Sequence, residues 1–149
     1  MICFVSECKP FSIQSDGCKN YKKRLQNEFA SIRSLYTELP IKSSVYSKIV
    51  YIHSVPTDID VDNMSKPFVD AFNGVIYSDD RVINHRVCSK VKFDDMGSIE
   101  INIGMLPTAI ANKLEELIER KNPHIVYFEI GPFTPDMVSI GGGNNETGT

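Results

Sequence analysis

The segment DIDVDNMSK at residues 58–66, followed by SDD at residues 78–80, determines how the rest of the chain is interpreted. Its site-forming side chains are four carboxylates and one lysine: Asp60, Asp62, Asp79, Asp80 and Lys66. Carboxylic acids ionise at about pH 4, so gathered carboxylates repel one another at neutral pH unless a cation joins them. A hard divalent ion, Mg²⁺ or Mn²⁺, is the cation that oxygen ligands favour.

An apolar run over residues 45–55 precedes this segment and is typical of a strand. Asp60 and Asp62 are two residues apart, so an extended backbone would point both side chains to one face. A second strand-like run, residues 81–91, begins immediately after Asp80. We therefore expect a strand–helix–strand passage that brings Asp80 back beside Asp60 and Asp62, with one carboxylate site at the ends of adjacent strands.

The residues between the two acidic groups predict a helix over residues 63–73. Apolar side chains recur there at helical spacing and define one buried face: Met64, Pro67, Phe68, Ala71 and Phe72. Lys66 follows Asp62 by one helical turn, which makes the two side chains neighbours. The pair Asn73 and Gly74 tolerates a left-handed backbone and ends the helix.

At these residues the chain resembles the RusA-type Holliday junction resolvases. That family carries Asp-x-Asp-Asn-x-x-Lys, then Asp-Ala-hydrophobic-Asn-Gly, then Asp-Asp before an aliphatic strand. The three elements are matched here by residues 60–66, 70–74 and 79–83. The resemblance covers roughly residues 45–92, and more loosely residues 9–14, which resemble the family's first strand and loop. Asp-x-Asp alone is a weak signal, whereas the whole string at matching spacing is specific.

The resemblance implies a metal-dependent endodeoxyribonuclease that resolves Holliday junctions, or other branched DNA, by paired symmetric nicks. It implies a role in DNA recombination and repair, in many members within a phage or prophage, and a homodimer that presents two identical sites. The implied cofactor is Mg²⁺ or Mn²⁺, and the implied partner is four-way junction DNA. The residues that the resemblance assigns are the catalytic Asp60, Asp62, Asp80 and Lys66, and the metal ligands Asp60, Asp62, Asp80 and Asp79.

Several other interpretations of the same residues compete. A non-catalytic DNA-binding relative would keep the fold and act as a structural or regulatory partner. A phosphohydrolase of small phosphate esters is weaker, because no glycine-rich phosphate loop is present. A calcium loop beginning at Asp58 is excluded, since Asn63 stands where glycine is needed and Val69 where the bidentate glutamate is needed.

Charge is unevenly distributed along a chain whose formal net charge is −3. Residues 1–50 carry eight Lys and Arg against four Asp and Glu, residues 51–100 five against nine, and residues 101–149 three against six. The basic first third is therefore the expected DNA-facing region, with phosphate contacts that would be salt-sensitive. A solvated helix face explains the cluster equally well. The candidate DNA-binding residues are Lys9, Lys19, Lys22, Lys23 and Arg24.

Length and composition predict a single α/β domain, a small mixed β-sheet packed with helices. We place the nuclease domain at residues 1–140, with a C-terminal helix–strand extension at 107–133 and a disordered glycine-rich tail at 141–149. No run of 18 apolar residues and no signal peptide is present, so no membrane partner is expected. The four cysteines lack metal-ligand spacing and are expected to be reduced thiols of a cytoplasmic protein.

Periodicity predicts the remaining elements. Strands are expected at residues 2–5, 45–54 and 125–130, with an extension of the first to residue 13 as an open alternative. Helices are expected at residues 20–39 and 109–121, with Thr108 as cap. A strand pair is expected from residues 81–93 and 98–104, joined by a turn at residues 94–97.

Overall fold

The computed structural model describes residues 1–11, 16–93 and 99–141. Its strands form one four-stranded sheet in the order β1-β4-β2-β3. Strands β2 and β3 are parallel, whereas β4 is antiparallel to both β1 and β2. The sheet is therefore mixed, as predicted. The strands are β1 (Ile2–Glu7), β2 (Val45–His53), β3 (Ile83–Lys92) and β4 (His124–Pro132).

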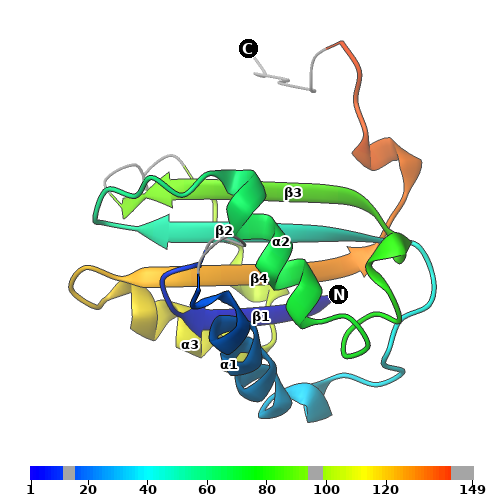
Figure 1. Cartoon of the computed structure of the whole chain (residues 1–149), viewed down its shortest axis with the longest axis horizontal. Helices are drawn as coiled ribbons and strands as arrows, with labels where there is room; N and C mark the ends of the chain where they lie inside the picture. The colour runs from blue at the N-terminus through cyan, green and yellow to red at the C-terminus, as the bar shows by residue number, and fades with distance from the viewer. Residues whose placement is uncertain (12–15, 94–98, 142–149) are drawn as a thin grey trace.

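Helices cover both faces of the sheet (Figure 1). On one face lie α1 (Cys18–Ala30) and α2 (Val61–Ala71), and on the other lies α3 (Thr108–Ile118). The connection from β2 through α2 to β3 is the crossover that joins parallel neighbours. The α/β class predicted from the sequence is confirmed.

The larger core lies between the sheet and the α1–α2 layer. The predicted apolar stripe of α2 is buried, with Met64, Phe68 and Phe72 inaccessible to solvent. Phe128 of β4 meets this stripe, its ring centroid 5.8 Å from that of Phe68 and 5.3 Å from that of Phe72. Every second residue of β2, beginning with Val45, faces the same core, as the two-residue period of a strand requires. This packing fixes which side of α2 faces solvent.

A smaller core lies under α3. Its members are Ile110, Leu114 and Leu117 from the helix and alternate residues of β1, β2 and β4: Cys3, Val5, Ile52 and Ile125. Strand β4 pairs with both β1 and β2, so the segment at 107–133 is built into the middle of the sheet. Packing on both faces makes it part of the same folded unit as the acidic segment.

The first helix is shorter than predicted. Helix α1 ends at Ala30, and a 3₁₀ turn, η1 (Arg33–Leu35), follows it. The predicted continuation to residue 39 is wrong because tertiary contacts redirect the chain there. The Tyr36 ring stacks on Phe29, and its hydroxyl donates to the carbonyl oxygen of Cys3 at 2.8 Å.

The predicted strand pair beginning at residue 81 is also wrong. Strand β3 forms, but in the described part of its supposed partner, residues 99–104, no strand is present. Ile99 and Ile101 instead pack singly against the α3 core, and η4 (Ile103–Met105) follows them. An alternating apolar pattern fits an extended segment packed on a core as well as it fits a paired β-strand. The pattern alone therefore could not distinguish the two structures. The predicted turn at residues 94–97 lies outside the described residues.

The remaining differences concern element ends. Thr108 is the first residue of α3 and makes no capping bond from its side chain, since Pro107 occupies the cap position. The extension of β1 toward residue 13 is wrong for residues 8–11, which form no strand, because β1 ends at Glu7. Residues 12 and 13 and the tail from residue 142 lie outside the described residues. A segment after β4 containing η5 (Pro135–Met137) leaves the body of the molecule (Figure 1). Within the described residues, no helix is both long and apolar enough to cross a bilayer.

Candidate active site

Asp60 caps the N-terminus of α2. Its backbone is extended, and one carboxylate oxygen accepts a hydrogen bond from the Asn63 amide at 2.8 Å. The other oxygen accepts from the Asn63 side-chain amide at 2.9 Å. A carboxylate at a helix N-terminus is favourable because it pairs free amide groups and the positive end of the helix dipole. Asp60 therefore has a structural role whatever its chemistry.

Asp62 lies in the first turn of α2 and is exposed to solvent. Strand β3 passes beside it, since the Cys88 thiol donates to the carbonyl oxygen of Val61 at 3.4 Å. Burial raises the pKa of Cys88 to about 11, and the negative charge of Asp62 contributes in the same direction. The thiol is therefore protonated at neutral pH, and it attaches the start of α2 to the middle of β3.

Lys66 joins two carboxylates on the solvent side of α2. Its ammonium donates to Asp70 Oδ1 at 2.5 Å and to Asp80 Oδ2 at 3.3 Å. These hydrogen bonds, first that to Asp70, raise the pKa of Lys66. Sequence spacing predicted Asp62 as the neighbour of Lys66, whereas the ion pairs recorded in the described residues are with Asp70 and Asp80.

The two members of the Asp79–Asp80 pair differ in environment. Asp79 caps the 3₁₀ turn η2 (Asp80–Val82) and accepts hydrogen bonds from the Arg81 amide at 2.9 Å and the Arg81 guanidinium at 3.0 Å. These bonds, first that from the guanidinium, lower the pKa of Asp79. Asp80 faces Lys66 instead. Asp80 is thus the member of the pair whose side chain reaches α2, and its catalytic role stays a prediction.

We expected the acidic residues to form one site at the ends of adjacent strands. The structure does not gather them there. Asp60 follows the C-terminal end of β2, and Asp80 precedes the N-terminal end of β3. Because these strands are parallel, the end of β2 and the start of β3 lie at opposite ends of the sheet, and the chain crosses between them through α2, whose first turn lies beside the middle of β3 (Figure 1). The carboxylates are therefore distributed along α2: Asp60 and Asp62 at its first turn, and Asp80 beside Lys66.

The spread of the carboxylates along α2 leaves no preformed metal cage among the described residues. Among residues 1–11, 16–93 and 99–141, no group of three or more His, Cys, Asp or Glu side chains is arranged to hold a metal ion. The donors themselves are carboxylate oxygens, which are the ligands that Mg²⁺ and Mn²⁺ prefer. The assignment of Asp60, Asp62, Asp79 and Asp80 as metal ligands stays a prediction.

Three residues near this site were not singled out from the sequence: Asp70, Arg86 and Lys90. Asp70 lies about 80° round the helix from Asp62, yet it follows Lys66 by one turn and binds it. Lys90 of β3 donates to the carbonyl oxygen of Ile59 at 2.7 Å, immediately before the cap residue. The i, i+4 relation of Lys66 and Asp70 was the available signal for Asp70.

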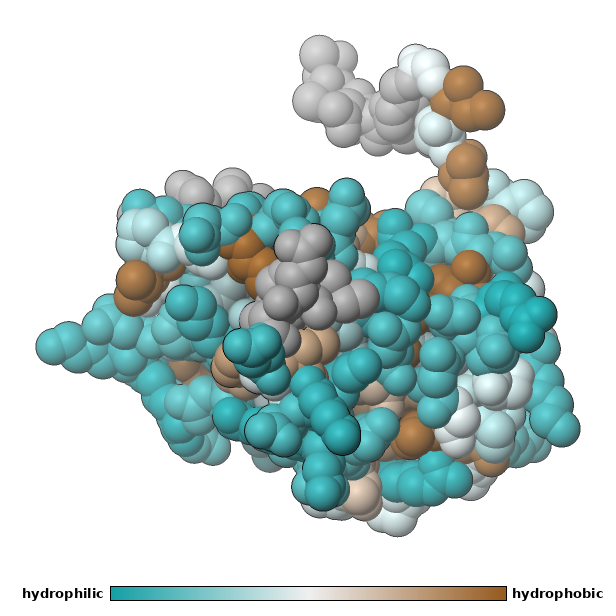
Figure 2. Space-filling model, viewed as in Figure 1, coloured by the Kyte–Doolittle hydropathy of each residue, from teal (hydrophilic) through white to brown (hydrophobic). Residues whose placement is uncertain are grey.

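Four of the five cations predicted to bind DNA belong to α1, which covers the same face of the sheet as α2. Helix α1 packs beside α2, with the Tyr21 and Phe68 ring centroids 5.8 Å apart. Lys9, Lys19 and Lys23 are exposed, and Lys22 is half-buried. Arg24 is engaged by Glu28 at 3.0 Å and by the Glu7 carbonyl oxygen at 2.7 Å. Figure 2 shows that hydrophilic side chains dominate this surface over α1 and α2.

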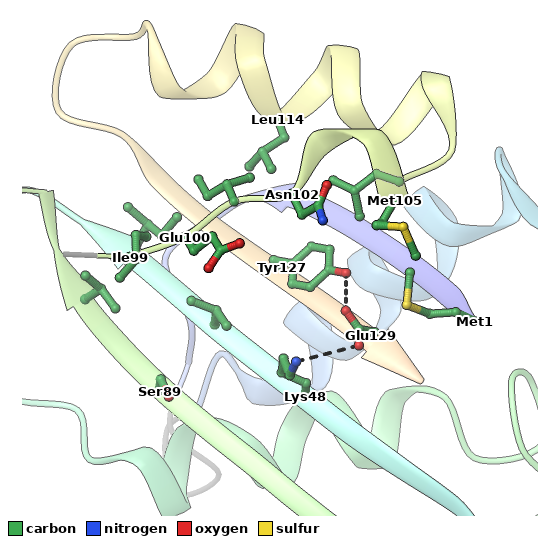
Figure 3. A pocket seen from close by; sticks show the side chains of 15 residues that line it. Met1, Lys48, Ser89, Ile99, Glu100, Asn102, Met105, Leu114, Tyr127 and Glu129 are labelled. Atoms are coloured by element: carbon green, nitrogen blue, oxygen red, sulfur yellow. Dashed lines mark hydrogen bonds and ion pairs between the residues drawn. The ribbon is translucent and has the colours of Figure 1, made fainter. Parts of the chain in front are cut away.

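A separate cavity of about 410 Å³ lies on the opposite face of the sheet, beside α3 (Figure 3). Its walls are largely apolar, and Glu129 and Tyr127 of β4 reach into it with Lys48 of β2. Glu129 accepts hydrogen bonds from the hydroxyl of Tyr46 at 2.5 Å and from that of Tyr127, and Lys48 lies 3.8 Å away. This carboxylate is therefore fully paired within the protein.

No curated protein matches this chain. The family model for endodeoxyribonuclease RusA matches residues 12–104, which is more than half of the 149 residues. That range includes α1, β2, α2 and β3, and with them every carboxylate discussed above on the α2 side of the sheet. The chain therefore belongs to the RusA endodeoxyribonuclease family.

Proposed function

We propose that this endodeoxyribonuclease cuts four-way junctions and other branched DNA by paired nicks in opposed strands, with a divalent metal ion as cofactor. The observation that carries the proposal is the occurrence of the whole family pattern on one helix and its flanking turns. Asp62 begins that helix, and Lys66 links it to Asp80 from the following turn. Recombination and repair, in a phage, prophage or cellular setting and in the cytoplasm, are the processes that this activity would serve.

The ion would be Mg²⁺ or Mn²⁺, held by Asp60, Asp62 and Asp80. Mg²⁺ commonly takes one or two protein carboxylates and completes its shell with water and substrate phosphate. A ready-made cage of three carboxylates is therefore not required. When bound, the ion supplies Lewis-acid polarisation of the phosphate and lowers the pKa of a coordinated water.

Lys66 acts in this proposal as a fixed positive charge. Its two carboxylate partners favour the ammonium form, so the side chain keeps its proton at neutral pH and does not serve as a base. A cation held in place beside the reacting phosphate stabilises the charge that develops on the phosphoryl oxygens. Asp70 would position this ammonium, since it makes the shorter of the two contacts, 2.5 Å against 3.3 Å for Asp80.

Paired nicks require two sites related by symmetry. A C2 homodimer presents two identical sites to the two opposed strands of a four-way junction, so we propose that the active species is a dimer. Its mass in solution would be twice the 16.7 kDa of the chain.

The test is cleavage of a synthetic four-way junction with Mg²⁺, Mn²⁺ or Ca²⁺, with the positions of the nicks mapped on all strands. The proposal predicts paired nicks across the branch point with Mg²⁺ or Mn²⁺, and their loss in Asp62→Asn with junction binding retained. Scattered nicks on linear duplex would indicate a general nuclease instead.

A non-cutting DNA-binding protein is the second candidate. It is favoured by one observation: both oxygens of Asp60 and one oxygen of Asp80 are already hydrogen-bonded within the protein. That candidate predicts junction binding without nicks under every metal condition, and no effect of Asp62→Asn on any nuclease readout.

A further inference from the structure

Strand β3 places a row of side chains alongside the carboxylates. It is an edge strand in the described sheet, and after the register shift at its start its alternate residues from position 86 to 92 face the α2 side. Cys88 establishes this orientation, because it packs against the α1–α2 core and contacts Val61. Two exposed cations flank it at two-residue spacing, Arg86 and Lys90.

Each member of the row lies against a different part of the acidic site. Lys90 contacts the Ile59 carbonyl oxygen before Asp60, and Cys88 contacts α2 at Val61. Arg86 lies further back along β3, near the end of the sheet from which Asp80 starts. Its positive charge acts on the Tyr77 hydroxyl, which also experiences the negative charges of Asp80 and Asp70. Arg86 and both carboxylate partners of Lys66 therefore lie within electrostatic range of the same hydroxyl.

Arg86 differs from the other arginines in its partners. The chain has five arginines, and four of them hydrogen-bond to protein oxygens: Arg24, Arg33, Arg81 and Arg120. Within the described residues, Arg86 has no hydrogen bond or ion pair, and its side chain is exposed. Its fork of N–H donors is thus left facing solvent on the side of the sheet where the acidic site lies.

A polyanion that approaches this site needs cations whose charge is not already neutralised. The Lys66 ammonium is shared between Asp70 and Asp80, and Arg24 of α1 is paired with Glu28. An unpaired guanidinium binds phosphate through two parallel N–H donors, which a lysine ammonium does not reproduce. Arg86 is the residue that meets both requirements beside the site.

We propose that Arg86 binds a backbone phosphate of the DNA strand that enters the acidic site, and that Lys90, about 13 Å along β3, binds a second one. This inference rests on the proposed function, because it extends the same site. It places the DNA path along edge strand β3 and across α2. The alternative path follows the lysines of α1.

The test measures the salt dependence of binding to a four-way junction in EDTA, where no cleavage occurs. For Arg86→Gln we expect a slope of log K against log[salt] that is less steep by about 0.9, one phosphate contact on duplex. Affinity should fall about 10- to 100-fold, as for a lost charge-assisted hydrogen bond. Arg86→Lys should recover the slope but only part of the affinity.

Two comparison variants make the result decisive. Lys121→Gln removes the same charge from an exposed position beyond α3, and it should leave the slope unchanged. A triple Lys19, Lys22 and Lys23→Gln variant tests the α1 path. An unchanged slope in Arg86→Gln, with a reduced slope in the α1 variant, would overturn the inference.

The outcomes separate this inference from the proposed function. Wild-type protein that binds the junction but never nicks it with Mg²⁺ or Mn²⁺ refutes the proposed function, while the Arg86→Gln slope still decides the inference. Wild-type protein that binds neither junction nor duplex overturns both. Circular dichroism of Arg86→Gln verifies that a change in binding does not reflect unfolding.

Discussion

Carboxylates on the two faces of the sheet differ in burial and in their hydrogen-bond partners. On the α3 face, Glu129 is nearly buried and accepts hydrogen bonds from two tyrosine hydroxyls, with Lys48 close by. On the α2 face, Asp62 is exposed, and Asp70 and Asp80 share one ammonium. Glu129 is thus surrounded by donors, whereas the carboxylates on the α2 face are more numerous than the single ammonium that pairs with them.

The difference separates structural from functional use of the same chemical group. A buried carboxylate must be satisfied within the protein because water cannot reach it. An exposed cluster with fewer donors than acceptors can still accept a metal ion or direct a phosphate. We therefore expect changes on the α3 face to alter stability, and changes on the α2 face to alter activity.

The largest expected effect is that of Lys66→Met. This substitution removes the ammonium between Asp70 and Asp80 and keeps the length of the side chain. Junction cleavage should fall on the order of 100-fold, the scale seen when one charge-stabilising donor is removed from an active site. Lys66→Arg should recover part of the rate, because it restores the charge with different geometry.

Lys121→Met is the matched control for Lys66→Met, since Lys121 is an exposed lysine outside the candidate DNA-binding residues. It should cleave within a few-fold of wild type. Equal losses in the two lysine variants would show that net charge matters and that the position of Lys66 does not.

Glu129→Leu should have the largest effect on stability. The half-buried hydroxyls of Tyr46 and Tyr127 lose the Glu129 acceptor, and each lost hydrogen bond costs about 0.5–1.5 kcal/mol. Urea unfolding measures the change in the free energy of unfolding. Asp70→Asn, on the other face, should change it by no more than about 0.5 kcal/mol. A larger loss in Asp70→Asn than in Glu129→Leu would reverse the proposed division between the faces.

Much of the α2 region could be predicted from the sequence because its determinants are local. The spacing of Met64, Phe68 and Phe72 fixes which side of the helix is buried, and Lys66 is then placed on the solvent side. The actual partners of Lys66 depend on where Asp80 returns after the turn at Gly74, and no local pattern specifies that return.

The errors arose where one pattern fits two structures. Alternating apolar residues such as Ile99 and Ile101 suit either a paired strand or an extended segment packed on a core. Arg86 lies in a correctly predicted strand, but its face depends on how β3 packs against α2. Contacts between distant segments decide both cases, so sequence periodicity could not.

Asp60 combines the two uses of a carboxylate, and substitutions can separate them. Asp60→Ala removes the helix cap and should destabilise the protein by about 1 kcal/mol. Asp60→Ser keeps a capping oxygen, so it should recover most of that stability while junction cleavage stays reduced. Urea unfolding and a cleavage assay on both variants provide the comparison. Full cleavage by Asp60→Ser would assign Asp60 to structure alone.

The smallest expected effect concerns pH and His124, which lies at the end of the sheet, opposite His53. Burial, followed by the nearby charges of Lys9 and His53, lowers the pKa of His124. The folded state then binds fewer protons than the unfolded state near and below the ordinary histidine pKa of about 6.5. This contribution to stability is therefore present above that pH and is lost as the pH falls through the lowered pKa.

Urea unfolding at about pH 7 and at about pH 5 measures this contribution, because the two values bracket the ordinary histidine pKa. Wild type should lose more free energy of unfolding than His124→Gln over this interval. Equal losses in the two proteins would mean that His124 does not contribute to the pH dependence.

A paired experiment on Asp80→Asn and Glu129→Gln tests the division between the two faces at single-atom scale, because each substitution replaces one carboxylate oxygen. Junction cleavage per folded molecule is the quantity to measure, with Mg²⁺ present. We predict that Asp80→Asn loses cleavage on the order of 100-fold, while Glu129→Gln cleaves like wild type. Wild-type cleavage by Asp80→Asn, or a comparable loss in Glu129→Gln, would contradict the assignment of activity to the α2 face.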